Sequence, residues 1–226
     1  MASLLEQLLS LAMAGTVMVS SSLNAAAPHN DVDNLLFLAN RQWRVSSAYV
    51  PDVREASVKG KVREMRDEAA TALEQLFADC KAATGKELYT VSGYRSYYTQ
   101  NSIYQRKLEK VGSQKKADNY VARPGASEHQ LGLAMDIGWD EYQGTSDKFP
   151  QSKAGAWCTE NCWKYGFILR YQTGWEDVTG YKTEEWHFRY VGKEHAARIY
   201  QNQMPLEEYL ILLRQAALMD IVIGVE

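Results

Sequence analysis

The chain has 226 residues, of which 46% are hydrophobic and 23% are charged, an ordinary composition for a globular protein. This length is enough for one domain with a substantial core. The formal net charge is -3 and the pI is about 5.9, so the chain lacks the basic surface that binds nucleic acid. We therefore expect no nucleic-acid partner.

The first 27 residues differ from the rest of the chain. Residues 8–19 form an apolar run with the length of a signal-peptide core, and small residues at 25–27 suit cleavage. The run is shorter than the roughly 20 apolar residues of a membrane span. Glu6 and the absence of lysine or arginine before Arg41 are atypical of a signal. We predict a leader at residues 1–27, either an export signal or a membrane-associated amphipathic segment, and a linker at residues 28–34.

Residues 35–226 predict one folded domain in which helices and short strands follow one another without a regular βαβ order. Apolar residues at three- and four-residue steps predict the helices, and alternating or β-branched runs predict the strands. After an extended stretch at residues 35–53, we expect helices at residues 59–84, 97–111, 154–165, 193 onward and 206–218, and strands at residues 87–92, 133–139, 167–171 and 187–191. This order favours an α+β domain.

The three cysteines are an odd number, which excludes a complete disulfide framework. Cys80 lies on the apolar face of a predicted helix and is interpreted as a buried, inert thiol. Cys158 and Cys162 are four residues apart and share one helical face. A bridge between them in an oxidising compartment and a zinc-binding role are alternatives, but packing is the favoured interpretation.

Four polar residues in two short segments are the strongest indication of function. His129 and Asp136 lie in SEHQLGLAMDIG, and Glu184 and His187 lie in EEWHFRYVG. Two imidazoles and a carboxylate hold zinc with one position open for water, and a further carboxylate accepts a proton from that water. Paired strands, one with Asp136 at its far end and one that begins at His187, would bring the ligands together. By spacing alone, a loop histidine, a turn acid and a solvated Glu184–Glu185 pair fit equally well.

Four motifs in a fixed order resemble those of the VanY-type D-alanyl-D-alanine carboxypeptidases, a family that includes L,D-carboxypeptidases. They are SGYRS at residues 92–96, PGASEHQLGLAMDI at 124–137, WKYGFILRY at 163–171 and EEWHFRYVG at 184–192. The resemblance extends over approximately residues 35–210. It implies the zinc fold shared with the hedgehog signalling domain, in which helices flank a small antiparallel sheet.

The resemblance also implies a zinc centre in this chain. One zinc ion is expected at His129, Asp136 and His187, and Glu184 corresponds to the family's catalytic base in its E-x-x-H arrangement. With these assignments the chain is expected to be a metal-dependent hydrolase.

Three further residues match positions with which the family grips its substrate: Arg95, Gln100 and Ser127. A guanidinium binds a free carboxylate through two charge-assisted hydrogen bonds, which suits recognition of a peptide C-terminus. Stabilisation of the oxyanion that forms during attack is the alternative role for Arg95. Gln100 and Ser127 have the alternative roles of orienting a loop or capping a helix.

The chain departs from the family pattern at two positions. Glu185 replaces the proline of the usual E-P-W-H motif, and Leu131 stands where threonine is usual. The first change removes a backbone restraint before the strand, and the second removes a hydroxyl near the first ligand. Neither change removes a ligand or the base, so activity is expected.

The expected substrate is a peptidoglycan stem peptide, from which the enzyme removes a terminal D-alanine by D,D- or L,D-hydrolysis. This implies extracytoplasmic action at a bacterial cell wall, by a secreted or membrane-anchored protein. We also expect the protein to be a monomer. A non-catalytic, zinc-containing peptidoglycan-binding module and a cell-wall endopeptidase are the alternatives.

Overall fold

The computed structural model describes residues 31–223, so the leader predicted at residues 1–27 and the start of the linker lie outside the described residues. The helices and strands are β1 (Arg54–Glu55), β2 (Glu64–Met65), α2 (Asp67–Thr84), β3 (Leu88–Ser92), α3 (Tyr97–Val111), α4 (Gln114–Asp118), η1 (Glu128–Leu131), β4 (Ala134–Trp139), η2 (Phe149–Gln151), α5 (Lys153–Asn161), η3 (Cys162–Tyr165), β5 (Phe167–Tyr171), α6 (Glu176–Thr179), β6 (Glu184–Tyr190), α7 (Lys193–Asn202) and α8 (Leu206–Ile223).

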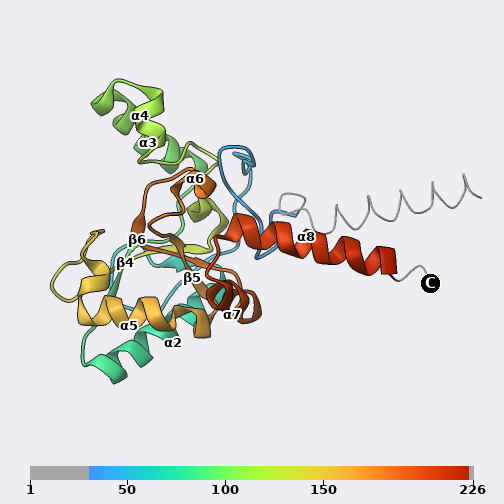
Figure 1. The fold of residues 1–226 in the computed structure, drawn as a ribbon. Coiled ribbons are helices and arrows are strands. Elements are labelled where there is room, and N and C mark those ends of the chain that lie inside the picture. The colour runs from blue at the N-terminus through green and yellow to red at the C-terminus, as the bar shows by residue number, and fades with distance from the viewer. Residues whose placement is uncertain (1–30, 224–226) are drawn as a thin grey trace, which may run out of the picture.

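A four-stranded antiparallel sheet lies at the centre of the molecule, with the strand order β3-β4-β6-β5 (Figure 1). A separate two-stranded ribbon is formed by β1 and β2. Helices around a small antiparallel sheet agree with the predicted α+β class.

The two faces of the central sheet differ in chemistry because side chains alternate along each strand. Met135 and Ile137 of β4 and Phe188 of β6 point into the main apolar core. Helices α2 and α5 cover this face, and their buried side chains complete the core (Figure 1). Asp136 and His187 occupy the intervening positions, so they point to the opposite face.

A second apolar cluster lies where α7 and α8 pack against β5. Ile168 of β5 meets Ile199 of α7 and Leu206 of α8 in this cluster. The first turn of α8 is therefore part of the domain, and the helix then extends away from the body (Figure 1). Among residues 31–223, no helix combines the length and the apolar character that crossing a membrane requires.

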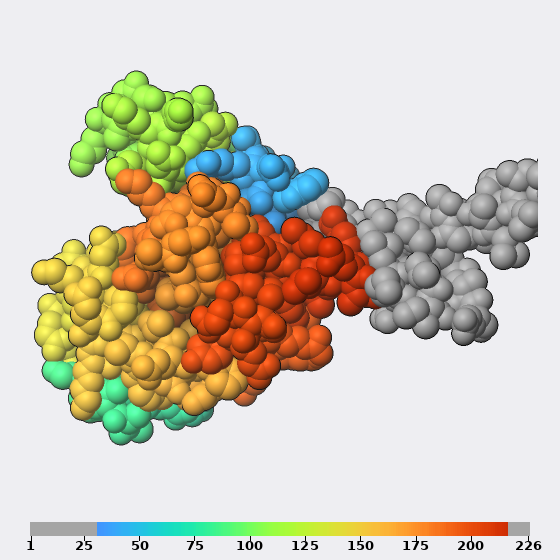
Figure 2. Space-filling model, in the orientation of Figure 1, coloured from blue at the N-terminus to red at the C-terminus, as the bar shows by residue number. Residues whose placement is uncertain are grey.

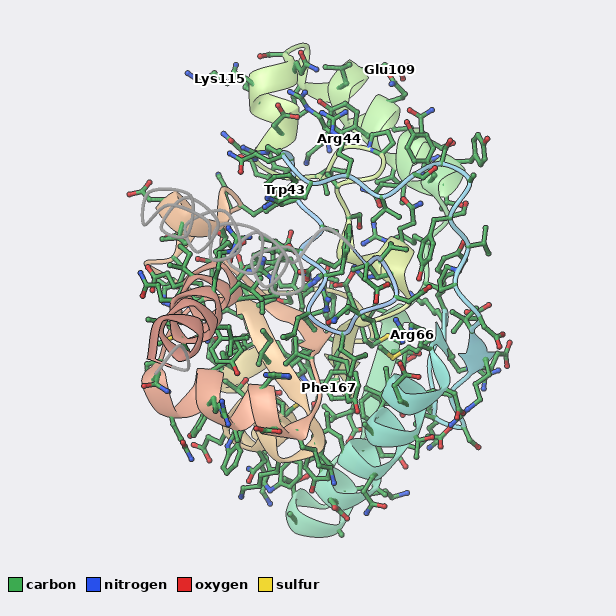
Figure 3. The ribbon with its side chains drawn as sticks, turned by 90° about the vertical axis from the view of Figure 1, so that its right-hand side faces the viewer. Trp43, Arg44, Arg66, Glu109, Lys115 and Phe167 are labelled. Carbon is green, nitrogen blue, oxygen red and sulfur yellow. The ribbon has the colours of Figure 1, made fainter. Side chains whose placement is uncertain are left out.

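Helices α3 and α4 form a lobe that stands out from the body (Figures 1 and 2). Figure 3 shows Glu109 and Lys115 at the outer end of this lobe and Arg44 at its base. Inside the lobe, Asp118 accepts a hydrogen bond from the Tyr104 hydroxyl at 2.7 Å and forms an ion pair with Arg123. These contacts fix the lobe to the loop that leads into η1.

The helix predicted at residues 59–84 begins eight residues later, at Asp67. The preceding residues are extended because the Lys61 amide donates to the Thr90 carbonyl at 2.9 Å, and the Thr90 amide donates to the Lys59 carbonyl at 3.0 Å. Between them Gly60 has φ of 139°, and a Cβ there would lie 2.3 Å from the Thr90 carbonyl oxygen. The contact with β3 therefore overrides the helical spacing of the apolar residues.

Other elements agree with the prediction to within a few residues. The strands predicted at 133–139 and 167–171 and the helix predicted at 97–111 are present as β4, β5 and α3. The helix predicted at 154–165 divides into α5 and η3, and the strand predicted at 187–191 begins earlier, at Glu184. Residues 35–53 contain no helix or strand, as expected.

All three cysteines are buried in the main apolar core, in agreement with the packing interpretation. Burial raises the pKa of Cys158 well above its usual range and that of Cys162 to about 12. Both thiols therefore stay protonated at neutral pH and are poor nucleophiles and metal ligands.

Replacement of Leu73 by alanine tests the main core. Leu73 of α2 is fully buried, and Leu73→Ala should lower the free energy of unfolding by about 2–5 kcal/mol. Leu212→Ala is the matched control, because Leu212 is 47% exposed on α8 and the same change there should cost less than about 0.5 kcal/mol. Urea unfolding of both variants gives the comparison, and equal losses would contradict the position of the core.

Candidate active site

The pairing of β4 with β6 sets Asp136 directly opposite His187. Asp136 Oδ1 lies 3.1 Å from His187 Nδ1 and 3.4 Å from His129 Nε2. One ligand atom from each of the three residues lies within 4.8 Å of the others, and all three residues are buried. Asp136 and His187 lie within their strands, whereas the sequence suggested the far end of one strand and the start of the other.

His129 enters this cluster from η1, which lies between the α3–α4 lobe and β4. Its Nδ1 lies 2.7 Å from the Gly93 carbonyl oxygen, so Nδ1–H donates and Nε2 carries the lone pair. Nε2 is buried and has no hydrogen-bond partner. A buried nitrogen without a partner is costly, and a metal ion bound to Nε2 would remove that cost.

His187 faces Asp136 with Nδ1, whereas His129 faces Asp136 with Nε2. The Nε2 of His187 lies 3.3 Å from Oε2 of Glu128. Burial alone would lower the pKa of His187, but the hydrogen bonds with Asp136 and Glu128 raise it to about 9. A metal ion held by Nδ1 would take the place of the proton on this nitrogen.

These donor atoms fit zinc. Two imidazole nitrogens and one carboxylate oxygen form a common set for catalytic zinc and leave one coordination position for a water molecule. Burial lowers the pKa of His129 to about 4, so this imidazole is neutral, as a metal ligand must be.

Glu184 faces the same cavity as His187 because β6 is irregular. In a regular strand, residues three apart point to opposite faces. The pairing of β5 with β6 shifts between Leu169–Phe188 and Tyr171–Glu184, which gives β6 two additional residues over this stretch. This irregularity brings Glu184 Oε2 to 3.8 Å from His187 Nδ1.

Burial raises the pKa of Glu184 to about 7, and the opposing effects of the positive charges of His187 and Arg95 are smaller. A carboxyl group with a pKa near neutrality can both accept and return a proton in the same reaction. Its neighbour Glu185 lines an adjacent cavity with Thr183 and Lys182. The two glutamates therefore line different cavities.

The predicted substrate-binding residues line the same cavity as the ligands, which has a volume of 230 Å³. Arg95 Nη2 lies 3.8 Å from Asp136 Oδ2, and Nη1 donates to Gln100 Oε1 at 3.0 Å. Gln100 in turn donates to the Ala122 carbonyl oxygen at 2.7 Å. Ser127 is buried at the entrance to η1. The guanidinium is thus oriented by an amide that is itself held by the backbone.

The structure brings all seven predicted site residues together, but the prediction omitted most of the cavity wall. The omitted residues include the aromatic side chains Tyr171, Tyr181 and Trp186, and the acid Glu128. The abundance of tyrosine and tryptophan in the chain was the available signal for the aromatic wall. Leu131, one of the two departures from the family pattern, is fully buried in the main core.

The VanY family model, described as D-alanyl-D-alanine carboxypeptidase, matches residues 62–193. The chain belongs to this family. The protein YodJ of Bacillus subtilis, which is named as a carboxypeptidase, is 43% identical over 190 residues, covering 78% of this chain and 67% of that protein's length.

Two solved structures have the same fold. The LdcB LD-carboxypeptidase is 42% identical with a TM-score of 0.75, over 80% of this chain and 86% of that one. A mutant of the VanY D,D-pentapeptidase from a VanB-type resistance cassette, solved in complex with Zn(II), is 35% identical with a TM-score of 0.66. That match covers 77% of this chain and 98% of the other. These likenesses confirm the predicted family, the fold class and the prediction of a carboxypeptidase-type enzyme. The roles of individual residues stay predictions.

Zinc titration tests the ligand cluster. The protein, after removal of metal by a chelator, should bind one zinc ion per chain, and His129→Ala or His187→Ala should abolish this tight binding. His195→Ala is the matched control, since His195 lies on α7 and its Nδ1 is 2.7 Å from the Tyr209 hydroxyl. Metal content after dialysis is the measurement. Full zinc occupancy in either ligand variant would remove that residue from the metal site.

Proposed function

We propose that the protein is a zinc-dependent carboxypeptidase that removes the terminal D-alanine from peptidoglycan stem peptides. The observation that carries this proposal is the buried His129–Asp136–His187 cluster, with an unpartnered Nε2 on His129, in a cavity shared with Glu184. Membership of the VanY family supports the substrate class. Bound zinc would activate water and polarise the scissile carbonyl group.

Glu184 is proposed as the group that moves the proton. Its carboxyl group has a pKa of about 7 and lies 3.8 Å from His187 Nδ1, beside the ligand cluster. As the carboxylate it accepts the proton of the attacking water, and as the acid it returns that proton to the departing amine. Burial supports both roles. A carboxyl group with an ordinary pKa is almost always ionised at neutral pH, so it rarely has a proton to donate. The raised pKa of Glu184 allows both the ionised and the protonated form near neutral pH.

Arg95 is proposed to bind the free C-terminal carboxylate of the substrate. Its guanidinium faces the cavity, its side chain is 18% exposed, and its Nε has no hydrogen-bond partner. The donors that remain free suit a planar carboxylate. Gln100 holds the guanidinium in place, and Ser127 contributes a hydroxyl to the same wall.

The substrate class implies that the protein acts outside the cytoplasm, at the cell wall. LdcB is named as an LD-carboxypeptidase and the VanY neighbour as a D,D-pentapeptidase, so relatives of this chain differ in the bond they cleave. Both tetrapeptide and pentapeptide stems are therefore the appropriate substrates for a test. The expectation that the protein is a monomer stays a prediction.

Incubation of the zinc-loaded protein with both stem peptides tests the proposal. Mass spectrometry should show loss of one alanine residue from at least one stem. Glu184→Gln should keep its zinc but lower kcat by roughly 100- to 10,000-fold, because the proton acceptor is lost. Glu185→Gln, the matched control, should stay near the wild-type rate. A zinc-loaded protein that releases no alanine would support the binding module instead, and an active Glu184→Gln variant would refute the base.

Substitution of Arg95 separates exopeptidase from endopeptidase action. Arg95→Lys keeps the charge but loses the two-point geometry, so kcat/KM for stem peptides should fall by ~10- to 100-fold. Arg106→Lys on the exposed side of α3 is the matched control and should have no effect. Cross-linked peptides without a free C-terminus serve as the second substrate. Their cleavage at an unchanged rate by Arg95→Lys would favour the endopeptidase alternative.

A further inference from the structure

Glu128 is a fully buried acid directly beside the first predicted ligand, and it has no role in the proposed reaction. Its side chain has no exposed surface. Oε1 accepts hydrogen bonds from Arg170 Nε and Arg189 Nη1, both at 2.9 Å. Oε2 lies 3.3 Å from His187 Nε2. A single carboxylate therefore links two buried arginines with one imidazole of the metal cluster.

The two arginines hold the carboxylate in one position. Arg170 also forms a two-point ion pair with Glu207 at the start of α8, at 2.6 and 3.0 Å. Arg189 donates as well to the carbonyl oxygens of Leu35 and Phe37 at 2.8 and 2.9 Å. The network thus contains the carboxylates of Glu128 and Glu207 and the guanidinium groups of Arg170 and Arg189. Each arginine has a further partner besides Glu128. A carboxylate fixed in this way has one oxygen left to act on His187.

We propose that Glu128 is a positioning residue that fixes the ring orientation and the tautomer of His187 for metal binding. An imidazole that donates Nε2–H to Glu128 carries its lone pair on Nδ1, the nitrogen that faces Asp136. For His129, the Gly93 carbonyl oxygen accepts the proton of Nδ1, which leaves the lone pair on Nε2. The two ligands are therefore oriented by different groups, one of the backbone and one of a side chain.

Only the side-chain partner can be removed by substitution, which makes the inference testable. It rests on the proposed zinc site. Glu128→Gln should weaken zinc binding by ~10- to 100-fold in a competition titration with a chelating dye. Glu207→Gln is the matched control, because Glu207 loses the same charge from the same arginine but does not contact His187. Because Arg189 still holds Glu128 in this variant, its zinc affinity should fall by less than that of Glu128→Gln.

A purely structural role for Glu128 predicts a different result. In that case both variants would have lower melting temperatures in the metal-free state, with zinc affinities that are unchanged or reduced equally. Either pattern would overturn the inference. Glu128→Asp is the second variant, for use if Glu128→Gln does not fold. It keeps the negative charge beside the arginines but shortens the side chain, so it should also weaken zinc binding. Wild-type zinc affinity in Glu128→Asp would likewise overturn it.

Nuclear magnetic resonance of the unmodified, zinc-loaded protein with ¹⁵N-labelled histidine tests the same point without a variant. We expect His187 to carry its proton on Nε2 and zinc on Nδ1, and His129 to show the reverse. A proton on Nδ1 of His187 would overturn the inference. If the wild-type protein binds no zinc, the proposed function fails instead, so the two failures are distinguishable.

Discussion

The pairing of β4 with β6 is the contact on which the site depends. This register places Asp136 opposite His187, and the same two strands send Met135 and Phe188 into the core on the other face. A shift of one residue would exchange the two faces and bury the carboxylate and imidazole among apolar side chains. The apolar core therefore fixes which face carries the predicted ligands, and the observed pairing sets Asp136 directly opposite His187 on that face.

The sequence predicted the fold well where local pattern and tertiary contact agree. Strands β4 and β5 and helix α3 follow from alternation, helical spacing and a terminal glycine, and each is present close to its predicted position. The start of α2 was wrong because residues 59–61 pair with Thr90, a contact between segments about 30 residues apart that helical periodicity does not reveal. The β6 irregularity that turns Glu184 toward His187 is equally invisible in the sequence, because it depends on pairing with β5.

The seven residues predicted for the site lie in one cavity, yet the prediction missed Glu128. An acid next to a histidine is usually a solvated residue, and nothing local distinguishes this one. The sequence signal for Glu128 lay elsewhere in the chain. Arg170 and Arg189 lie within runs that predict buried strands, and two buried arginines require acidic partners. Sequence motifs thus locate groups that perform chemistry more readily than the groups that hold them in place.

The hydrogen bonds of Arg189 indicate which part of the chain must be present for the domain to fold. Its bonds to the carbonyl oxygens of Leu35 and Phe37, and the bond from Gln130 to the carbonyl oxygen of Ser46 at 2.8 Å, tie a segment without helices or strands to the back of the metal cluster. Glu207 does the same from the C-terminal side. All of these partners lie beyond residues 62–193, the span shared with the family model. A fragment trimmed to that span would contain every proposed catalytic group but would lack partners of the buried Arg170 and Arg189. The motifs alone therefore do not mark the limits of the unit that folds.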